Sequence, residues 1–448
     1  MSRYSPYPAY DDSGFPKHWK AMRLRFAVTL NPSKNEITLS DSELVSFIPM
    51  DAVGEYGGIR LDEDKELAQI GSGYTYFCDN DVVVAKITPC FENGKGAIAK
   101  GLTNGCAFGT TELHVLRVDL ELLDPDFLFY LTISDWFRDL GESEMYGAGG
   151  QKRVPEDFIK NLITGIPPKH EQLTIVEFLD YKVAQIDELI AKKQALLDKL
   201  VEQRTALISQ AVTKGLDPSV PMKDSGVNWL GEIPSHWQCL PLRRLSHYVK
   251  TGTTPTGVNE LHFDDEGLPW YKPGDFTDGV FLKSAGNKLS QEGVEAVRTF
   301  PSDTVMQVGI GATIGKVAIA KSPASCNQQI NCIHCNEKLH HLFAVYFLRA
   351  IRDFIVKCGK YTTLPIINQD ETKSLPFTVP SYDEQVTISN YLLEAEKKSS
   401  RQSKKVLEII ERLQEYRAAL ITNAVTGKID VRDFCIPTTT EQREVAHG

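Results

Sequence analysis

The side chains best suited to chemistry occur in short clusters that combine amides or hydroxyls with lysine or arginine. Lysine and arginine contact phosphates, and arginine, lysine, asparagine and glutamine can each pair with the edge of a base. Each such residue is also typical of a solvated surface. The candidate contacts are Lys86, Lys95, Lys100, Gln151, Lys152 and Arg153 in the first half of the chain, and Thr251, Lys272, Lys316, Gln328, Gln329, Lys360 and Tyr361 in the second. Gln151-Lys152-Arg153 is the densest mixture, beside glycines that permit close approach.

Two strings resemble catalytic or cofactor motifs but are incomplete. Adenine methyltransferases carry an Asn/Asp-Pro-Pro-aromatic motif, whereas Asn31-Pro32-Ser33-Lys34 lacks the second proline and the aromatic that would clamp a flipped base. In Gly309-Ile-Gly311-Ala-Thr-Ile-Gly315 the last glycine comes one position late for a dinucleotide loop. We therefore expect turns at both places and no catalytic residues.

A cysteine and histidine cluster, Cys332-Ile-His334-Cys335 with Cys326 nearby, raises the question of a zinc site. On a strand, Cys332 and Cys335 would point to opposite faces, and no second CxxC stands at zinc-site spacing. We expect half-buried thiols and no metal. Nine cysteines without regular spacing also indicate free thiols in a reducing compartment.

The elements that must position these side chains are bounded by length and composition. The chain has 448 residues, 42% hydrophobic and 24% charged, which predicts about two to four soluble domains. No apolar run approaches the ~18 residues of a membrane helix, and residues 1–10 lack a signal-peptide pattern. These features predict a cytoplasmic protein. The net charge of −10 argues, at face value, against a polyanionic partner.

An internal repeat organises the chain. The segment EQLTIVEFL, from Glu171, returns as EQVTISNYL from Glu384, and Arg204 corresponds to Arg417 at the same offset of 213 residues. Pro16, His18 and Trp19 match Pro234, His236 and Trp237, and Gly94-Lys95 matches Gly315-Lys316. The chain is therefore two copies of one unit.

Each copy has a globular part followed by a long helix. Short β-branched and aromatic runs punctuated by Gly and Pro predict a mixed α/β domain. A heptad seam then predicts a helix in each copy, and the two helices would bury one another as an intramolecular coiled coil. Polar residues on the seam, Lys193, Arg204 and Arg417, can set the register and orientation of a coiled coil. We favour the alternative that their apolar stems pack while their heads extend to solvent. The first seam comprises Val183, Ile186, Ile190, Lys193, Leu197, Leu200, Arg204, Leu207 and Ala211, and the second runs from Leu392 through Glu396, Ser399, Ser403, Val406, Ile410, Leu413, Arg417 and Leu420 to Ala424.

These residues resemble the specificity subunits of type I restriction-modification systems. The resemblance is carried by DSGVNWLGEIPSHW (residues 224–237), by Pro167-Pro168 before Glu171-Gln172, by RTALISQAVT (204–213) and by GATIGK (311–316). It covers the chain to about residue 430. The first copy lacks the WLGEI spacer, and the second helix is preceded by one proline fewer.

The resemblance implies two target recognition domains alternating with two antiparallel spacer helices. The expected boundaries are 1–165 and 216–378 for the domains, 166–215 and 379–430 for the helices, and 431–448 for a flexible tail. Each domain would read half of a split, asymmetric target in double-stranded DNA. Two methyltransferase subunits, using S-adenosylmethionine, and two restriction subunits, using ATP and Mg²⁺, would join a chain that is itself non-catalytic and holds no cofactor.

The acidic charge need not contradict this interpretation. The excess of acidic residues lies almost entirely in residues 1–165. A recognition domain that contacts bases need not be basic if its partner subunits contact the DNA phosphates. We therefore expect weak DNA binding by the isolated chain. The alternatives are a coiled-coil adaptor that does not bind DNA and a self-sufficient methyltransferase, which the missing motifs disfavour.

Overall fold

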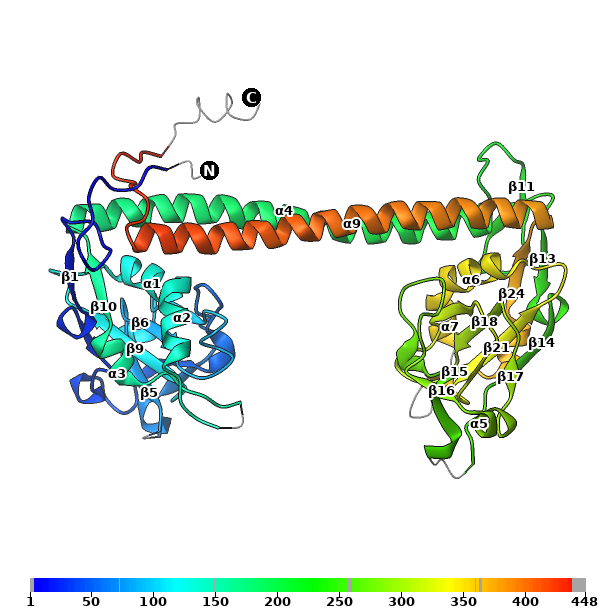
Figure 1. Ribbon diagram of the computed structural model, residues 1–448, viewed down its shortest axis with the longest axis horizontal. Coiled ribbons are helices and arrows are strands. Elements are labelled where there is room, and N and C mark those ends of the chain that lie inside the picture. Colours follow the sequence, from blue (N-terminus) through cyan, green and yellow to red (C-terminus); the bar gives the residue numbers. More distant parts are fainter. Residues whose placement is uncertain are drawn as a thin grey trace. The chain divides into compact units, whose positions relative to one another are not determined.

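The computed structural model describes residues 4–71, 73–148, 150–256, 260–358, 360–361 and 365–436, without the side chains of residues 358, 360 and 361. The chain divides into two compact units, one comprising Met1–Gln194 with Glu408–Gly448 and the other Ala195–Leu407. Each unit joins one globular α/β domain to a portion of both long helices (Figure 1).

The globular domain of the first unit contains two four-stranded sheets. The first sheet is antiparallel and the second contains one parallel pair, β3 with β8. In sheet order, the strands are β2 (Val28–Leu30), β9 (Leu113–Val118), β6 (Val82–Ala85) and β7 (Gly96–Ile98), then β4 (Asp64–Glu66), β3 (Leu44–Ile48), β8 (Cys106–Gly109) and β5 (Thr75–Cys78). Central strand β6 is buried on both faces, as its run of three valines predicts.

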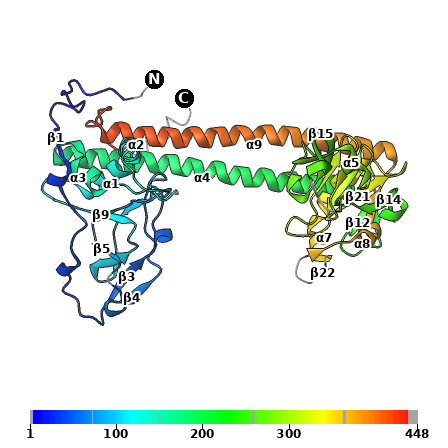
Figure 2. The same cartoon turned by 60° about the horizontal axis from the view of Figure 1, so that its bottom comes forward.

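Helices α1 (Pro125–Ile133) and α2 (Asp135–Ser143) lie between these sheets and the long helices (Figures 1 and 2). Asp124 caps α1 through two backbone N–H groups, and Ser134 caps α2. After α3 (Glu156–Asn161), strand β10 (Ile163–Ile166) pairs with β1 (Lys20–Arg23) and leads directly into helix α4 (Lys169–Lys214).

The second unit repeats this strand order. Its sheets run β14 (Ser246–Thr251), β21 (Ile330–Cys335), β18 (Thr304–Val308) and β19 (Val317–Ala320), then β16 (Asn287–Leu289), β15 (Phe263–Tyr271), β20 (Ala324–Cys326) and β17 (Thr299–Phe300). Again one pair, β15 with β20, is parallel. Short antiparallel pairs join β13 (Gln238–Pro241) to β24 (Pro376–Val379), β11 (Met222–Asp224) to β12 (Glu232–Pro234), and β22 (Lys360–Tyr361) to β23 (Pro365–Ile366). The matching topology confirms the internal repeat.

The helices of the second unit also follow the repeat. Helix α6 (His341–Ala350) is buried along most of its length and packs against β18 and β19, which is the place that α1 takes beside β6 and β7. The others are α5 (Gln291–Glu295), α7 (Arg352–Cys358), α8 (Gln369–Ser374) and the long α9 (Tyr382–Val425). In the described part of the chain, no helix is both long and apolar enough to cross a membrane.

The long helices pack along the predicted seam. In the first unit Val183 and Ile186 of α4 share a core with Leu413 and Leu420 of α9. In the second unit the end of α4 shares a core with the beginning of α9. The beginning of each helix therefore meets the end of the other, which confirms an antiparallel intramolecular pair.

One expectation about the seam is wrong. The head of Arg417 does not extend to solvent: its side chain is 16% exposed, and Nη1 donates to Asp187 Oδ1 at 2.6 Å. The guanidinium carbon also lies 4.5 Å from the ring centre of Tyr56. A partner on the facing helix and an aromatic face make burial of the cation favourable.

The first unit is built from both ends of the described chain. Tyr7 and Trp19 share its core with Ile429 and Val431. Asp430 N donates to Ser5 O at 2.8 Å, and Tyr10 Oη donates to Gly427 O at 3.0 Å. Residues before β1 and after α9 thus complete one hydrophobic core.

Candidate nucleic-acid interface

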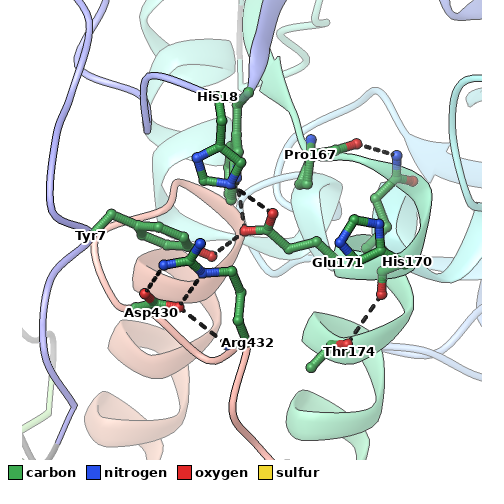
Figure 3. A network of polar contacts seen from close by, with 10 residues as sticks. Tyr7, His18, Pro167, His170, Glu171, Thr174, Asp430 and Arg432 are labelled. Atoms are coloured by element: carbon green, nitrogen blue, oxygen red, sulfur yellow. Dashed lines mark hydrogen bonds and ion pairs between the residues drawn. The ribbon is translucent and has the colours of Figure 1, made fainter.

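A glutamate, buried in the first unit and half-buried in the second, joins the globular domain to the first turn of each long helix. In the first unit His18 Nε2 lies 2.8 Å from Glu171 Oε2 (Figure 3). Trp19 Nε1 donates to Glu171 Oε1 at 3.0 Å. Tyr7 Oη also donates to Glu171. Burial and the nearby Glu171 carboxylate raise the pKa of Tyr7 above its usual range, so the phenol keeps the proton that it donates.

The second unit repeats this anchor with Glu384. Trp237 Nε1 donates to Glu384 Oε1 at 3.1 Å, and His236 Nε2 lies 3.0 Å from Oε2. The repeated His-Trp and Glu-Gln motifs therefore meet in space, although about 150 residues separate them along the chain. Their chemistry is structural, because Glu171 is 1% exposed and its oxygens accept hydrogen bonds from within the chain.

The glutamine that follows the glutamate in each motif donates hydrogen bonds to nearby backbone carbonyl groups. Gln172 Nε2 donates to Leu122 O and Pro167 O, and Gln385 Nε2 donates to Lys338 O and Pro380 O. Both glutamines are fully buried. Each helix thereby begins at a defined place on its domain, which holds the loops of that domain in a fixed orientation to the helix.

Some of the predicted DNA-contact residues lie together in loops at one edge of the first domain. Lys86 N donates to Glu112 O at 2.9 Å, Val154 N donates to Lys86 O at 2.8 Å, and Thr88 N donates to Lys152 O at 3.0 Å. Residues 86–88, 110–112 and 150–154, which we name the first loop edge, therefore lie side by side. Gln151 and Lys152 are exposed there, as a base or phosphate contact requires.

Three other predicted cations of this domain are held by the chain itself. Arg153 donates to both oxygens of Glu112 at 2.9 and 2.8 Å, and this contact lowers the pKa of Glu112. Lys95 Nζ donates to Met50 O at 3.3 Å, and Lys100 Nζ donates to Asp126 at 2.8 Å. Arg153 therefore stabilises the loop edge, and Lys95 and Lys100 lie outside it.

A groove of about 380 Å³ adjoins the first loop edge. It is lined by Asn31, Pro32, Lys34, Tyr74, Thr75, Tyr76, Lys86, Thr111 and Leu113. Lys34 and Tyr74 are exposed, so the lining of the groove includes a cation and an aromatic ring. Neither was among the predicted contacts, since they come from turns and strands that are distant in the sequence.

Asn31 forms the turn expected at this place. Its backbone adopts φ 50°, a left-handed conformation that asparagine tolerates better than most residues. Its side chain accepts from Val115 N at 2.9 Å and donates to Glu156 at 2.8 Å. The asparagine is therefore structural.

In the second domain, hydroxyl and amide side chains lie around residues 327–329, which link β20 to β21 as residues 110–112 link β8 to β9. Thr251 Oγ1 lies 3.3 Å from Asn331 Oδ1, Thr254 Oγ1 donates to Gln328 Oε1, and Asn327 Nδ2 donates to Gln329 Oε1. We name residues 251–254 and 327–329, with Arg298, the second loop edge. Arg298 N donates to Thr253 Oγ1 at 2.7 Å, and its exposed side chain donates from Nη1 to Thr251 O. Sequence reasoning missed Arg298 because it is an isolated cation.

The remaining predicted residues of the second domain make other contacts. Lys272 Nζ donates to Asn287 Oδ1 at 2.8 Å and lies 4.9 Å from the ring centre of Trp270. Lys316 Nζ donates to Phe276 O at 3.1 Å. The side chains of Lys360 and Tyr361 lie outside the described part of the chain.

The two edges are supported by the same internal contact. His114 Nε2 lies 2.9 Å from Val154 O in the first domain, and Asn331 Nδ2 donates to Ile367 O at 3.0 Å in the second. Burial lowers the pKa of His114, which keeps the ring neutral with a proton on Nε2. One side chain in each domain thus holds the loop that precedes the last short helix, α3 in the first domain and α8 in the second.

The cysteines of β20 and β21 are more buried than expected. Cys326 and Cys332 are fully buried with their sulfurs 3.2 Å apart, whereas Cys335 packs on the opposite face of β21. Burial raises the pKa of Cys335 to about 12. Within the described ranges, no group of three or more His, Cys, Asp or Glu side chains could hold a metal ion.

A family model for the type I restriction modification DNA specificity domain matches residues 63–199 and 234–412. The chain belongs to this family. The two matched segments correspond to the two copies of the repeat, and each ends in a long helix.

Similar proteins carry the same family description. The chain is 41% identical over 162 residues to the type I restriction enzyme EcoEI specificity subunit of Escherichia coli, and 39% identical over 176 residues to the EcoAI specificity subunit of the same species. These matches span 36% and 39% of this chain and only 27% and 29% of the two relatives. A putative type I restriction enzyme MjaX specificity subunit of Methanocaldococcus jannaschii is 22% identical over 79% of both chains.

Solved structures of the family share the fold. A chain from a structure of complex assembly and conformational transition of the type I R-M system aligns with a TM-score of 0.74 and 16% identity, covering 94% of this chain and all of that one. The HsdS subunit from Thermoanaerobacter tengcongensis aligns with a TM-score of 0.54 and the same identity, covering 94% of this chain and 99% of its own.

Proposed function

We propose that this member of the family is the DNA specificity subunit of a type I restriction-modification complex, and that each loop edge reads one half of a split DNA target. The observation that carries the proposal is the presence of two domains with the same strand order whose exposed loops carry different side chains. The first offers Gln151, Lys152 and Lys86, and the second offers Gln328, Thr251 and Arg298. Two different readers in one chain would recognise an asymmetric sequence.

The chemistry of these side chains fits base and phosphate contacts. An exposed amide such as Gln151 or Gln328 can pair with both N6 and N7 of adenine, and an arginine such as Arg298 can pair with guanine. Lys86 and Lys152 are suited to phosphate. The anchors at Glu171 and Glu384 would hold each edge at a set orientation to its helix while DNA is bound.

Catalysis belongs to other subunits in this proposal. Two methyltransferase subunits with S-adenosylmethionine would modify the target, and two restriction subunits with ATP and Mg²⁺ would cleave unmodified DNA. The complex would act in the cytoplasm. Because the first domain carries the excess acid, we expect the isolated chain to bind DNA weakly and the methyltransferase subunits to complete the grip on the backbone.

The test is methylation by a reconstituted complex. The full chain would be co-expressed with a type I methyltransferase subunit, and the methylated adenines of the host would be mapped by sequencing. The proposal requires one split motif whose two halves change independently when the first or the second loop edge is altered. A stable complex that methylates no split motif, or methylation by this chain alone, would contradict it.

A further inference from the structure

The second unit contains a cavity of about 270 Å³ at a position that an aromatic ring fills in the first unit. Arg204 of α4, Lys316 and Arg352 of α7 line this cavity, together with Asp278 and Asp353. Arg204 also borders a cavity of about 300 Å³ between the two long helices. These spaces have no role in the proposed reading of DNA.

In the first unit the equivalent cations have partners. Arg138 donates to Glu92 O and to Asp135, and Arg417 donates to Asp187, although Arg138 Nε, like Arg204 Nε, has no hydrogen-bond partner among the described residues. Arg417 corresponds to Arg204 in the repeat, and Arg138 on α2 occupies the place of Arg352 on α7. The ring of Tyr56 lies between them, with its centre 4.5 Å from the Arg417 guanidinium carbon and 5.4 Å from that of Arg138. The Asp187 carboxylate accepts from Arg417 at 2.6 Å.

Both of these partners are missing from the second unit. Ser400 stands where the repeat would place the counterpart of Asp187, and it lines a cavity with Arg204. The loop that corresponds to Tyr56 carries Thr277 and Asp278, which line the other cavity. Among the described residues, the Nε of Arg204 is buried without a hydrogen-bond partner. A buried donor without an acceptor is destabilising.

The nearest buried carboxylate is already engaged. Glu396 is 12% exposed, accepts from Arg349 Nη1 at 3.2 Å and accepts from Tyr346 Oη at 3.0 Å. Arg349 completes its contacts with the backbone oxygen of Asp278 at 3.0 Å. Arg349 and Glu396 therefore form a neutral pair. The rest of the lining sets Arg204, Lys316 and Arg352 against Asp278 and Asp353, an excess of one positive charge.

We propose that this cavity is a binding site for a carboxylate group, with Arg204 as the main donor and Arg352 beside it. A guanidinium presents paired N–H groups that match the two oxygens of a carboxylate. The bound group would supply from outside the chain the acceptor that Asp187 supplies within the first unit. An acidic side chain of a protein partner and a free organic acid both carry this group.

The binding test uses the full chain and does not depend on DNA recognition. Thermal unfolding and hydrogen exchange would be measured in sodium acetate and in sodium chloride of equal concentration. We expect acetate to raise the unfolding midpoint of the second unit by about 2–4 °C and to slow exchange in residues 200–208. Arg204→Leu should lose this difference, whereas the matched variant Arg417→Leu should keep it.

A second variant supplies the missing acceptor internally. Ser400→Asp restores the pattern of the first unit, so it should raise the midpoint in chloride and remove the further effect of acetate. An acetate response that is equal in the wild type and Arg204→Leu, or a Ser400→Asp variant that is no more stable and still responds to acetate, would overturn the proposal.

A cross-linking arm distinguishes the two sources of the carboxylate. Thr205, which is exposed and lines the cavity, would be replaced by p-benzoylphenylalanine in chain co-expressed with a methyltransferase subunit. An adduct beside an Asp or Glu of that subunit identifies a protein side chain as the ligand. Acetate binding without an adduct identifies a free organic acid. Neither an adduct nor an acetate effect would refute the site and leave the proposed function untouched.

Discussion

The indole N–H of Trp19 donates to the buried carboxylate of Glu171 over 3.0 Å, and Trp237 and Glu384 repeat the contact at 3.1 Å. The same pair of residue types thus joins domain to helix twice. A buried carboxylate that loses a donor keeps its desolvation cost without full compensation. The anchor therefore makes the first unit sensitive to a single substitution at tryptophan, and the second unit less so, because the Glu384 side chain is 31% exposed.

Trp19→Phe should lower the free energy of unfolding of the first unit by about 1.5–3 kcal/mol, the typical value of a hydrogen bond to a charged group. Hydrogen exchange in the first two turns of α4 and in β10 would measure the change. Trp237→Phe is the matched control and should shift the faster exchange to the second unit. Equal effects of both variants on both units would contradict an anchor that acts locally.

Asp187→Asn should lower the free energy of unfolding of the first unit by about 1 kcal/mol, because Arg417 loses its charged acceptor while the ring of Tyr56 remains. Arg417→Leu should lower it further, since this substitution also removes the contact with the ring. Arg412→Leu, an exposed cation on the same helix, should change little. Exchange rates in residues 183–190 would report the difference, and an Arg412 effect as large as that of Arg417 would refute the pairing.

Substitutions at the loop edges should change the methylated sequence. Gln151→Ala should relax one half of the target and Gln328→Ala the other, each by about 10–100-fold in discrimination at one base pair. Lys152→Ala should instead reduce methylation of all sites alike. Methylome sequencing measures both outcomes, with the exposed Gln185→Ala on α4 as the control. A motif unchanged by either glutamine substitution would exclude these side chains as base contacts.

His114 should make the first unit less stable in mild acid. Burial lowers its pKa in the folded chain from the ordinary value of 6.5, so the unfolded state binds more protons below that pH. Stability contributed by the neutral ring is present above about pH 6.5 and is lost as the pH falls toward the folded-state pKa. Unfolding of the first unit, followed by hydrogen exchange from pH 7.5 to 5, would show the slope.

His114→Asn provides the control for this pH dependence. Asn331 makes the equivalent contact in the second unit, so an asparagine at position 114 should keep a donor to Val154 O without a titrating ring. The stability of the first unit should depend less on pH in this variant than in the wild type over the same range. An unchanged slope would assign the pH dependence to other groups.

The parts of the molecule that were predictable from sequence are those encoded by local pattern and repetition. The match between residues 171–213 and their copy predicted two long helices that bury one another, and the seam residues Val183 and Ile186 are indeed packed in the core of their unit. Their antiparallel order was implied by the family resemblance. The alternation that placed Cys332 and Cys335 on opposite faces of β21 is also observed.

Contacts between distant residues were not predictable in the same way. Arg153 looked like a DNA contact, but Glu112, 41 residues away, binds it. The seam pattern predicted an exposed head for Arg417, but Tyr56 and Asp187 lie beside it. In each case the partner is chosen by how strands and loops fold together, which single-sequence patterns do not report.

The mixed origin of the first unit has a consequence for synthesis on the ribosome. Residues 195–407 are contiguous and can complete their unit as soon as they emerge, whereas the core around Trp19 also needs Ile429 and Val431. The domain that is made first is therefore finished last, after most of the chain has been translated.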